Sequence, residues 1–520
     1  MTINGRYLGA FVLLAVAVPS CVYGQDSAAK CAEMAKFQSR QMAATITAAR
    51  FVPPGPMTAG PGAPANSPSV TLPAYCRIEG IVDSRTGIGG ASYGIGFAIA
   101  MPENWTRRFL MQGGGGLNGV IREPVGIQAV GNVPALSRGY AVASNDTGHK
   151  GGNFDGSFMP DQQAALDFYF EANGRFALLA KEIVGAYYGR PAEHSYFIGC
   201  STGGREAMIM SQRFPGYFDG IVSGDPAIRT GHSNMGLAFL GATFKKAAQE
   251  MIAKADYEAL FSDGDKKLIL SAMLKTCDAK DGLADGMIFA KCDFDPAILN
   301  CTGAKTDSCI MPLQSSALKN AFAGPKDFRG NATYAAFPYD VGIAETGSRL
   351  PGLLSGPRIP VPKPISTDFD ADAEVSALTN DPNTRLGDST WTNLSSFSGH
   401  SGKLIFYHGS SDPWFSALDT LGYYERMARA NGGAEKVFSW SRLFLVPGMA
   451  HCQGGEATLD QFDMLTAITD WVEKDKSPES VTATGRDFPG RSRPLCAYPA
   501  HAQYNGTGNP EDAANFSCQK

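Results

Sequence analysis

Several signals that would define common protein classes are missing from this 520-residue chain. It has no CxxC pair and no HExxH sequence, so the usual spacings of zinc ligands are absent. No GK[ST] follows its glycine-rich stretch, which argues against a phosphate-binding loop. Its 45 basic residues are fewer than its 50 acidic residues, and the net charge is −5. A nucleic-acid partner is therefore not expected.

Long apolar runs are also missing, except near the start. Residues 8–20 form an apolar stretch behind Arg6, of the length of a signal peptide and too short for a comfortable membrane span. The small residues before Gln25 predict cleavage there, so residues 1–24 are interpreted as a signal peptide, with a membrane anchor as the alternative. No later run of 18 apolar residues occurs. We therefore expect a soluble, secreted or periplasmic protein without a membrane partner.

The cysteine count agrees with export. The chain has 11 cysteines, and removal of Cys21 with the signal peptide leaves ten. An even number in an exported chain predicts disulfides, whereas a reduced cytosolic protein with scattered thiols is the alternative. Hydrophobic residues make up 44% of the chain, which is enough for a large core.

The order of apolar segments predicts an α/β fold. Residues 52–68 are rich in Pro and Gly and predict an exposed connector after an N-terminal helical stretch. Strand-like and helix-like segments then alternate up to residue 227, which is typical of a mostly parallel sheet covered by helices. This alternation of strand-like and helix-like segments stops in residues 228–398 and resumes in residues 399–520. We predict a core formed by 25–227 and 399–520, with 228–398 as an insertion.

A candidate nucleophile lies between a predicted strand and a predicted helix. The sequence GCSTG (199–203) fits G-x-S-x-G, in which a tight turn exposes the serine hydroxyl and glycines permit close backbone contacts. Ser201 is therefore the predicted nucleophile. The alternative is a glycine-rich turn with a solvated serine.

The acid and the base are expected later in the chain, in that order. Asp412 follows one predicted strand and His451 follows the next. His451 would accept the proton of the nucleophile, and Asp412 would orient the imidazole and stabilise its charged form. Asp419 is a rival acid, but it lies where a helix begins and favours the helix dipole. His408 is interpreted as a packed core histidine.

Two further groups are candidates for the pocket. The backbone N–H of Thr202, directly after the nucleophile, is an expected donor to the oxyanion. A second donor is expected from QGGGGLNG (112–119), and Gly114 or Gly115 is the predicted source. His149 is a further candidate for the pocket lining.

Cysteines flank both the nucleophile and the base. Cys200 directly precedes Ser201, and Cys452 directly follows His451. A disulfide holds its two Cα atoms roughly 5.5–6 Å apart, so a Cys200–Cys452 bond would hold the serine and the histidine close together. Such a long loop would also stabilise the fold by roughly 4–5 kcal/mol in the chain-entropy model.

These features together resemble the tannase and feruloyl esterase family, which includes hydrolases of mono(2-hydroxyethyl) terephthalate. The resemblance covers most of the chain after residue 24 and implies an α/β-hydrolase core with a large lid, esterase activity on aromatic acids and the Cys200–Cys452 disulfide. It also implies the pairs Cys31–Cys76, Cys277–Cys292, Cys301–Cys309 and Cys496–Cys518. The motifs that carry it are GCSTGGRE, SQRFPGYFDGIVSGDPA, YHGSSDPWFSALDT, YYERM, LFLVPGMAHCQGG and RPLCAYP.

An acidic loop of the predicted lid is a candidate calcium site. The sequence CDAKDGLADGMIFAKC (277–292) places three carboxylates between two cysteines, and hard oxygen ligands suit Ca²⁺. The spacing is not that of an EF-hand, and a solvated acidic loop is the alternative. The resemblance implies a structural calcium ion held by the side chains of Asp278, Asp281 and Asp285 and by the backbone carbonyls of Leu283 and Met287.

The resemblance leaves the substrate open. Phe415 matches an aromatic residue of the substrate pocket in terephthalate monoester hydrolases, and Arg349 is the nearest candidate for binding a substrate carboxylate. Thr202 stands where those enzymes can carry a glutamate. We therefore expect a small aromatic ester of the feruloyl or galloyl type, with mono(2-hydroxyethyl) terephthalate as the alternative. A serine peptidase and a non-catalytic binding module are the alternatives of other classes. The sequence predicts no oligomeric state.

Overall fold

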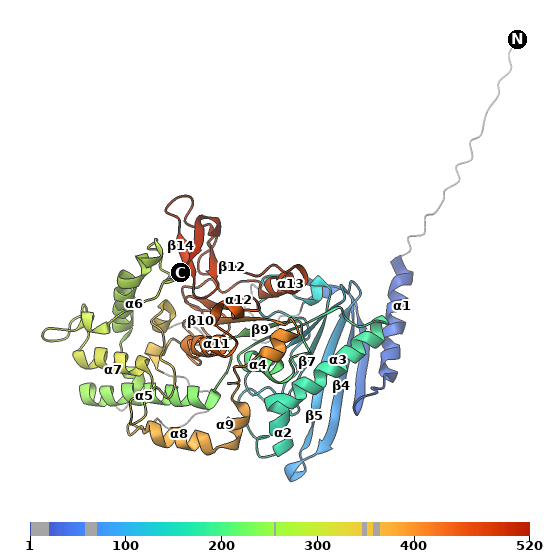
Figure 1. Cartoon of the computed structure of the whole chain (residues 1–520), viewed down its shortest axis with the longest axis horizontal. Helices are drawn as coiled ribbons and strands as arrows, with labels where there is room; N and C mark the ends of the chain where they lie inside the picture. Colours follow the sequence, from blue (N-terminus) through green and yellow to red (C-terminus); the bar gives the residue numbers. More distant parts are fainter. Residues whose placement is uncertain (2–19, 58–69, 254–255, 346–350, 357–364) are drawn as a thin grey trace.

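The computed structural model describes residues 1, 20–57, 70–253, 256–345, 351–356 and 365–520 (Figure 1). Most of the predicted signal peptide lies outside these residues. Helix α1 (Ser20–Glu33) runs through the position of the predicted cleavage before Gln25. None of the helices in the described ranges is both long enough and apolar enough to span a membrane.

A nine-stranded mixed sheet is the centre of the fold. Its order is β1-β4-β5-β7-β6-β8-β9-β10-β11. The first three pairings are antiparallel, and the five from β7 to β11 are parallel, as the alternation of strands and helices predicts. The strands are β1 (Ala44–Val52), β4 (Tyr75–Thr86), β5 (Ser92–Pro102), β7 (Tyr140–Asn145), β6 (Arg108–Gln112), β8 (His194–Cys200), β9 (Gly220–Gly224), β10 (Lys403–Gly409) and β11 (Ser441–Val446).

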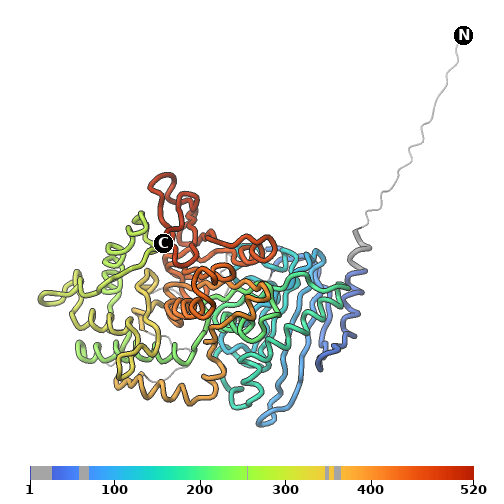
Figure 2. The backbone as a smooth tube through the Cα atoms, in the orientation of Figure 1, coloured from blue at the N-terminus to red at the C-terminus, as the bar shows by residue number. Residues whose placement is uncertain are grey.

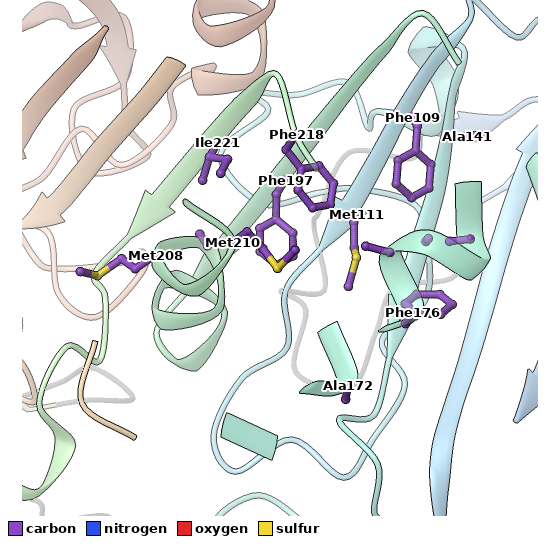
Figure 3. Close-up of a cluster of buried hydrophobic side chains, with 14 of the residues drawn as sticks. Phe109, Met111, Ala141, Ala172, Phe176, Phe197, Met208, Met210, Phe218 and Ile221 are labelled. Atoms are coloured by element: carbon purple, nitrogen blue, oxygen red, sulfur yellow. The ribbon is translucent and has the colours of Figure 1, made fainter. Parts of the chain in front are cut away.

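Helices cover both faces of the parallel half, because its strands are apolar on both sides. Helices α3 (Ala172–Tyr188), α4 (Thr202–Arg213) and α11 (Ala417–Ala430) share one buried cluster with the sheet. Figure 3 shows part of this cluster, in which Phe197 of β8 lies beside Met210 of α4. Helix α13 (Met464–Lys474) packs on the opposite face, where Trp471 and Ile468 belong to a second cluster.

Between β9 and β10 the chain leaves the sheet and forms a separate helical body (Figures 1 and 2). It has its own buried cluster, which includes Leu240, Phe244, Leu318 and Phe322. This body fits the predicted insertion, while the boundaries at 228 and 398 stay predictions. Its helices are α5 (Thr230–Ile252), α6 (Asp263–Cys277), α7 (Pro312–Ala323), α8 (Ala371–Asn380), α9 (Pro382–Gly387) and α10 (Ser395–Gly399).

The remaining elements are short. The N-terminal helical stretch expected before the 52–68 connector is present as α1, and strand β1, which pairs with β4, lies between them. Residues 58–69 of the connector lie outside the described residues. The short elements are β2 (Gly55–Pro56), β3 (Thr71–Leu72), α2 (Gln162–Leu166), α12 (Ala434–Phe438), β12 (Ser480–Thr484), β13 (Ser492–Cys496), β14 (His501–Tyr504) and β15 (Phe516–Gln519).

Candidate active site

Ser201 occupies the sharp turn between β8 and α4. Its backbone has φ 66° and ψ −124°, a conformation that residues other than glycine rarely adopt. The turn is held by a hydrogen bond from the Ser201 N–H to the carbonyl of Gly224, with N and O 3.0 Å apart. A Cβ atom on Gly203 would lie 2.8 Å from the carbonyl oxygen of Gly114, so glycine is needed there for the close approach of the two loops. The geometry is that of a nucleophile elbow.

Asp412 and His451 meet at the carboxyl ends of neighbouring strands β10 and β11. The Nδ1 atom of His451 lies 2.7 Å from Oδ2 of Asp412. The other carboxylate oxygen, Oδ1, accepts the N–H groups of Trp414 and Phe415 at 2.7 and 3.1 Å. Burial opposes ionisation of Asp412, yet the charges and hydrogen bonds of His451 and His408 hold its pKa below the usual value.

The second ring nitrogen of His451, Nε2, is available to accept a proton. Its Nε2 atom is buried and has no hydrogen-bond partner within the described ranges. The Cys200–Cys452 disulfide joins the residues beside Ser201 and His451, and its two Cα atoms are 6.0 Å apart. The bond connects positions separated by 252 residues. The serine and the histidine are thus tied together across the inserted helical body.

A hydrogen bond of the glycine-rich loop excludes one of the two glycines predicted to donate to the oxyanion. The N–H of Gly114 donates to Oε2 of Glu206 at 2.9 Å, so it is not free for an oxyanion. Gly115 is the member of the predicted pair that remains. The hydroxyl of Thr202 donates to the carbonyl of Gly116, which holds the loop against the start of α4.

A cavity of about 180 Å³ opens at Ser201. Trp414 and Phe415 form one wall, with ring centres 4.7 and 5.4 Å from that of His451. Phe415 was expected from the sequence, whereas Trp414 was missed although it directly precedes Phe415. Arg349 lies outside the described residues. The other apolar lining residues are Leu117, Phe154, Met159, Phe168, Tyr169 and Ala227.

A polar wall closes another part of the cavity. Arg205, one helical turn after Ser201, is buried and donates to the carbonyls of Tyr169 and Phe168. Asp388 of the inserted body also lines the cavity, and burial raises its pKa to about 6. Its Oδ2 lies 3.7 Å from Nδ1 of His232. The cavity therefore offers aromatic surface together with a few charged groups.

The rival residues have other partners. Asp419 forms an ion pair with Arg229. His149 stacks on Phe158 with ring centres 3.6 Å apart, and its Nε2 lies 2.9 Å from the carbonyl oxygen of Leu117, a residue of the cavity wall. His408 is buried, as expected, but its Nε2 also lies 3.4 Å from Oδ2 of Asp412.

All five disulfides that the resemblance implies are present. Two lie in the inserted body and one in the C-terminal segment. They are Cys31–Cys76, Cys200–Cys452, Cys277–Cys292, Cys301–Cys309 and Cys496–Cys518.

The acidic loop has the ligand types that calcium prefers. Burial and repulsion from Asp285 and Asp278 raise the pKa of Asp281 to about 6, which indicates negative charge held close together. The carboxylates of Asp278 and Asp281 accept backbone N–H groups of their own loop, and Asp285 pairs with Arg493. In the described part of the chain, triplets of ligand atoms within 4.8 Å of one another lie around Asp225 instead. The carboxylate oxygens of the loop are thus bound to N–H groups and to Arg493, and they are not among these triplets.

The family is established by comparison. The family model described as "Tannase and feruloyl esterase" matches residues 76–353 and 366–519. The chain belongs to the tannase and feruloyl esterase family, and it is a carboxylic ester hydrolase.

Sequence relatives cover most of the chain. The mono(2-hydroxyethyl) terephthalate hydrolase of Piscinibacter sakaiensis is 37% identical over 88% of this chain and 86% of its own length. A probable feruloyl esterase B-2 of Aspergillus flavus is 29% identical over 74% of this chain and 76% of its own length.

A solved structure has the same fold. Feruloyl esterase B of Aspergillus oryzae superposes with a TM-score of 0.75 over 95% of this chain and 100% of its own, at 24% identity. The mixed sheet with its inserted body is therefore an α/β-hydrolase fold.

Proposed function

We propose that this enzyme hydrolyses esters of aromatic carboxylic acids through an acyl-enzyme on Ser201. The observation that carries the proposal is the 2.7 Å contact between Nδ1 of His451 and Asp412, which leaves Nε2 without a partner among the described residues, in a histidine that the Cys200–Cys452 disulfide holds near Ser201. Ser201 Oγ attacks the ester carbonyl as His451 Nε2 takes its proton. The alcohol leaves with that proton. Water, activated by the same nitrogen, then releases the acid.

Two backbone donors would bind the oxyanion. The N–H of Thr202 begins helix α4, where the helix dipole favours negative charge. The N–H of Gly115 is the second, because the glycine-rich loop is held to the same helix by Glu206 and Thr202. Both donors would act without rearranging, which is the usual source of such stabilisation.

The cavity favours an aromatic acyl group. Its aromatic lining suits a planar ring, and its charged groups suit polar substituents on that ring. Esters of the feruloyl or galloyl type fit these two properties. Family membership supports the same substrate class.

Mono(2-hydroxyethyl) terephthalate is the second candidate. The 37% identity to a hydrolase of that ester is the observation that favours it. Phe415 would stack on the substrate ring, since it lines the cavity beside His451. In this role Arg349 would bind the free carboxylate of the substrate.

Two properties of the mature protein belong to the same proposal. We infer that residues 1–24 direct the chain out of the cytoplasm, which agrees with its five disulfides. We also infer that the acidic loop holds a structural Ca²⁺ through Asp278, Asp281 and Asp285, aided by the carbonyls of Leu283 and Met287. The ion would offset the charge of the loop and take no part in ester cleavage.

The experiment that tests this function is a matched panel of esters. The purified protein is assayed with methyl ferulate, methyl gallate, mono(2-hydroxyethyl) terephthalate and a short p-nitrophenyl ester. Preference for one of the aromatic acids supports the proposal and names the acyl group. Activity on the p-nitrophenyl ester alone contradicts the aromatic-acid assignment while leaving the serine mechanism intact.

A further inference from the structure

A second histidine and a second carboxylate lie behind Asp412. Asp225 directly follows strand β9, and His408 lies in strand β10 beside it. Both residues are 0% exposed. The backbone of Asp225 has φ 35°, and its Oδ1 accepts the N–H of Gly409 at 2.9 Å. The carboxylate of Asp225 is therefore fixed in the interior, next to the acid of the proposed triad.

The protonation of His408 follows from its neighbours. Its Nε2 lies 3.0 Å from the carbonyl oxygen of Phe415, which can only accept, so Nε2 carries a hydrogen. The same nitrogen lies 3.4 Å from Oδ2 of Asp412 and 3.6 Å from Oδ1 of Asp225. A nitrogen that carries hydrogen is not a metal ligand, so this triplet is better interpreted as a chain of acids and bases. At the other side of the ring, Nδ1 lies 2.8 Å from the Thr420 hydroxyl.

We propose that Asp225 and His408 are positioning residues. The ring of His408 is a charged imidazolium that lies between the carboxylates of Asp225 and Asp412 and balances their charge. The inference rests on the proposed roles of Asp412 and His451. Two buried carboxylates this close cannot both stay ionised at low cost unless a cation lies between them. With His408 charged, Asp412 keeps one negative charge for His451 and is held in place from behind.

Burial and the charge of the partner residue act in opposite directions on the pKa of His408 and on that of Asp225. Burial opposes the charging of His408, but Asp225 and then Asp412 raise its pKa above the ordinary value. Burial raises the pKa of Asp225 to about 7, and the charge of His408 opposes that rise. Other ionisable groups surround Asp225, His408 and Asp412. They are His451, Tyr407 and Asp340. The phenol of Tyr407 interacts with Asp225, and Asp340 binds the residue before Asp412. The Cys200–Cys452 disulfide, whose Cys200 Sγ lies 3.4 Å from Asp225, carries no charge.

The test follows the titration of His451 by NMR in the unreacted protein. His408→Gln keeps a donor for the Phe415 carbonyl but removes the cation, so a proton on His451 or on Asp225 must balance the two carboxylates. We expect His451 to keep its proton to a pH higher by about one unit or more. Asp225→Asn added to His408→Gln removes one carboxylate and should reverse at least half of that shift, because Asn still accepts from Gly409.

Asp340→Asn in the same background is the matched control. Asp340 is also buried, and its Oδ2 accepts from the Ser411 hydroxyl and from the N–H of Gly448, in the loops that carry Asp412 and His451. It should not reverse the shift. The proposal is overturned if neither His451 nor Asp225 takes up a proton in His408→Gln, or if Asp340→Asn reverses the shift of His451 as well as Asp225→Asn does.

A second measurement is available if His408→Gln does not fold. In wild-type protein the His408 ring should carry both protons near neutral pH, and Asp225→Asn should let it lose one at lower pH. A neutral His408 at pH 7 in the wild type would overturn the proposal. Both titrations are made without substrate, so they stand apart from loss of the proposed esterase activity.

Discussion

Glu206 accepts the N–H of Gly114 at 2.9 Å and so ties the glycine-rich loop to helix α4. The same carboxylate accepts from the Asn118 side chain, and Glu206 is 1% exposed. The loop that would supply an oxyanion donor is therefore held by a buried acid on the helix that follows Ser201, the proposed nucleophile. This arrangement gives the first prediction.

Glu206→Ala should lower kcat by roughly 10²-fold with a smaller change in KM, because a displaced loop moves one oxyanion donor. Steady-state kinetics with the preferred ester measure this effect. Asp265→Ala is the matched control, since it also removes a buried carboxylate, but one that binds Ser262 and Lys305 in the inserted body. Equal effects of the two variants on kcat and KM would show that general destabilisation, not the oxyanion loop, explains the result.

The Cys200–Cys452 disulfide should matter for both stability and rate. The Cys200→Ala/Cys452→Ala protein should lose roughly 5 kcal/mol of unfolding free energy in the chain-entropy model, because the bond closes a long loop. Its kcat should also fall, since the bond no longer holds Ser201 near His451. Urea denaturation and kinetics below the unfolding transition measure the two effects.

Cys301→Ala/Cys309→Ala serves as the comparison, because that bond closes a short loop with a separation of 8 residues in the inserted body. It should cost less stability and leave kcat almost unchanged. A kcat loss of similar size in both double variants would contradict a positioning role for the Cys200–Cys452 bond.

Calcium should stabilise the protein in a pH-dependent manner. The folded-state pKa of Asp281 is raised to about 6, above its unfolded value, so without a cation this group favours folding at low pH. Its contribution is present below the unfolded pKa of about 4 and is lost as pH rises to about 6. An ion that binds the ionised carboxylates should therefore raise Tm more at pH 7 than at pH 5.

Differential scanning calorimetry with CaCl₂ or with EGTA measures that difference. Asp281→Asn should remove most of the calcium effect at pH 7. The same substitution at Asp327, a partly exposed acid elsewhere in the inserted body, should leave it intact. A calcium effect that Asp281→Asn does not change would place the ion elsewhere.

The aromatic wall should select the acyl group. Trp414→Ala should raise KM for aromatic esters by about tenfold or more, because the side chain covers the cavity beside His451. A short aliphatic p-nitrophenyl ester should lose less. Equal losses for both substrates would show that Trp414 positions His451 and does not contact the acyl ring.

Sequence patterns predicted the strand ends that carry Ser201, Asp412 and His451, because buried parallel strands are apolar runs followed by a turn. Strands β1, β4 and β5 were not predicted. Alternate residues of β1 and β4 are partly exposed, which gives a weaker apolar signal. The disulfide pairing came from the family resemblance alone, since ten cysteines allow many connectivities.

Contacts between distant segments were beyond the reach of the sequence. The hydrogen bond from the Gly114 N–H to Glu206 depends on how the glycine-rich loop lies over α4. The spacing of residues in the sequence does not predict that arrangement. Asp225 follows a predicted strand in the same way as Asp412, but its place behind Asp412 depends on the order of β9 and β10 in the sheet. Such relationships appear only once the strands are arranged.

The most direct test of the central claim is covalent labelling of the nucleophile. The protein is treated with a fluorophosphonate, which reacts with activated serines, and the modified peptide is identified by mass spectrometry. Ser211→Ala is the matched control for Ser201→Ala, because Ser211 lies on the same helix and binds only the Met208 carbonyl among the described residues. We predict stoichiometric labelling at Ser201, with loss of labelling and of turnover in Ser201→Ala alone. Labelling at another residue, or near wild-type turnover by Ser201→Ala, would contradict the account.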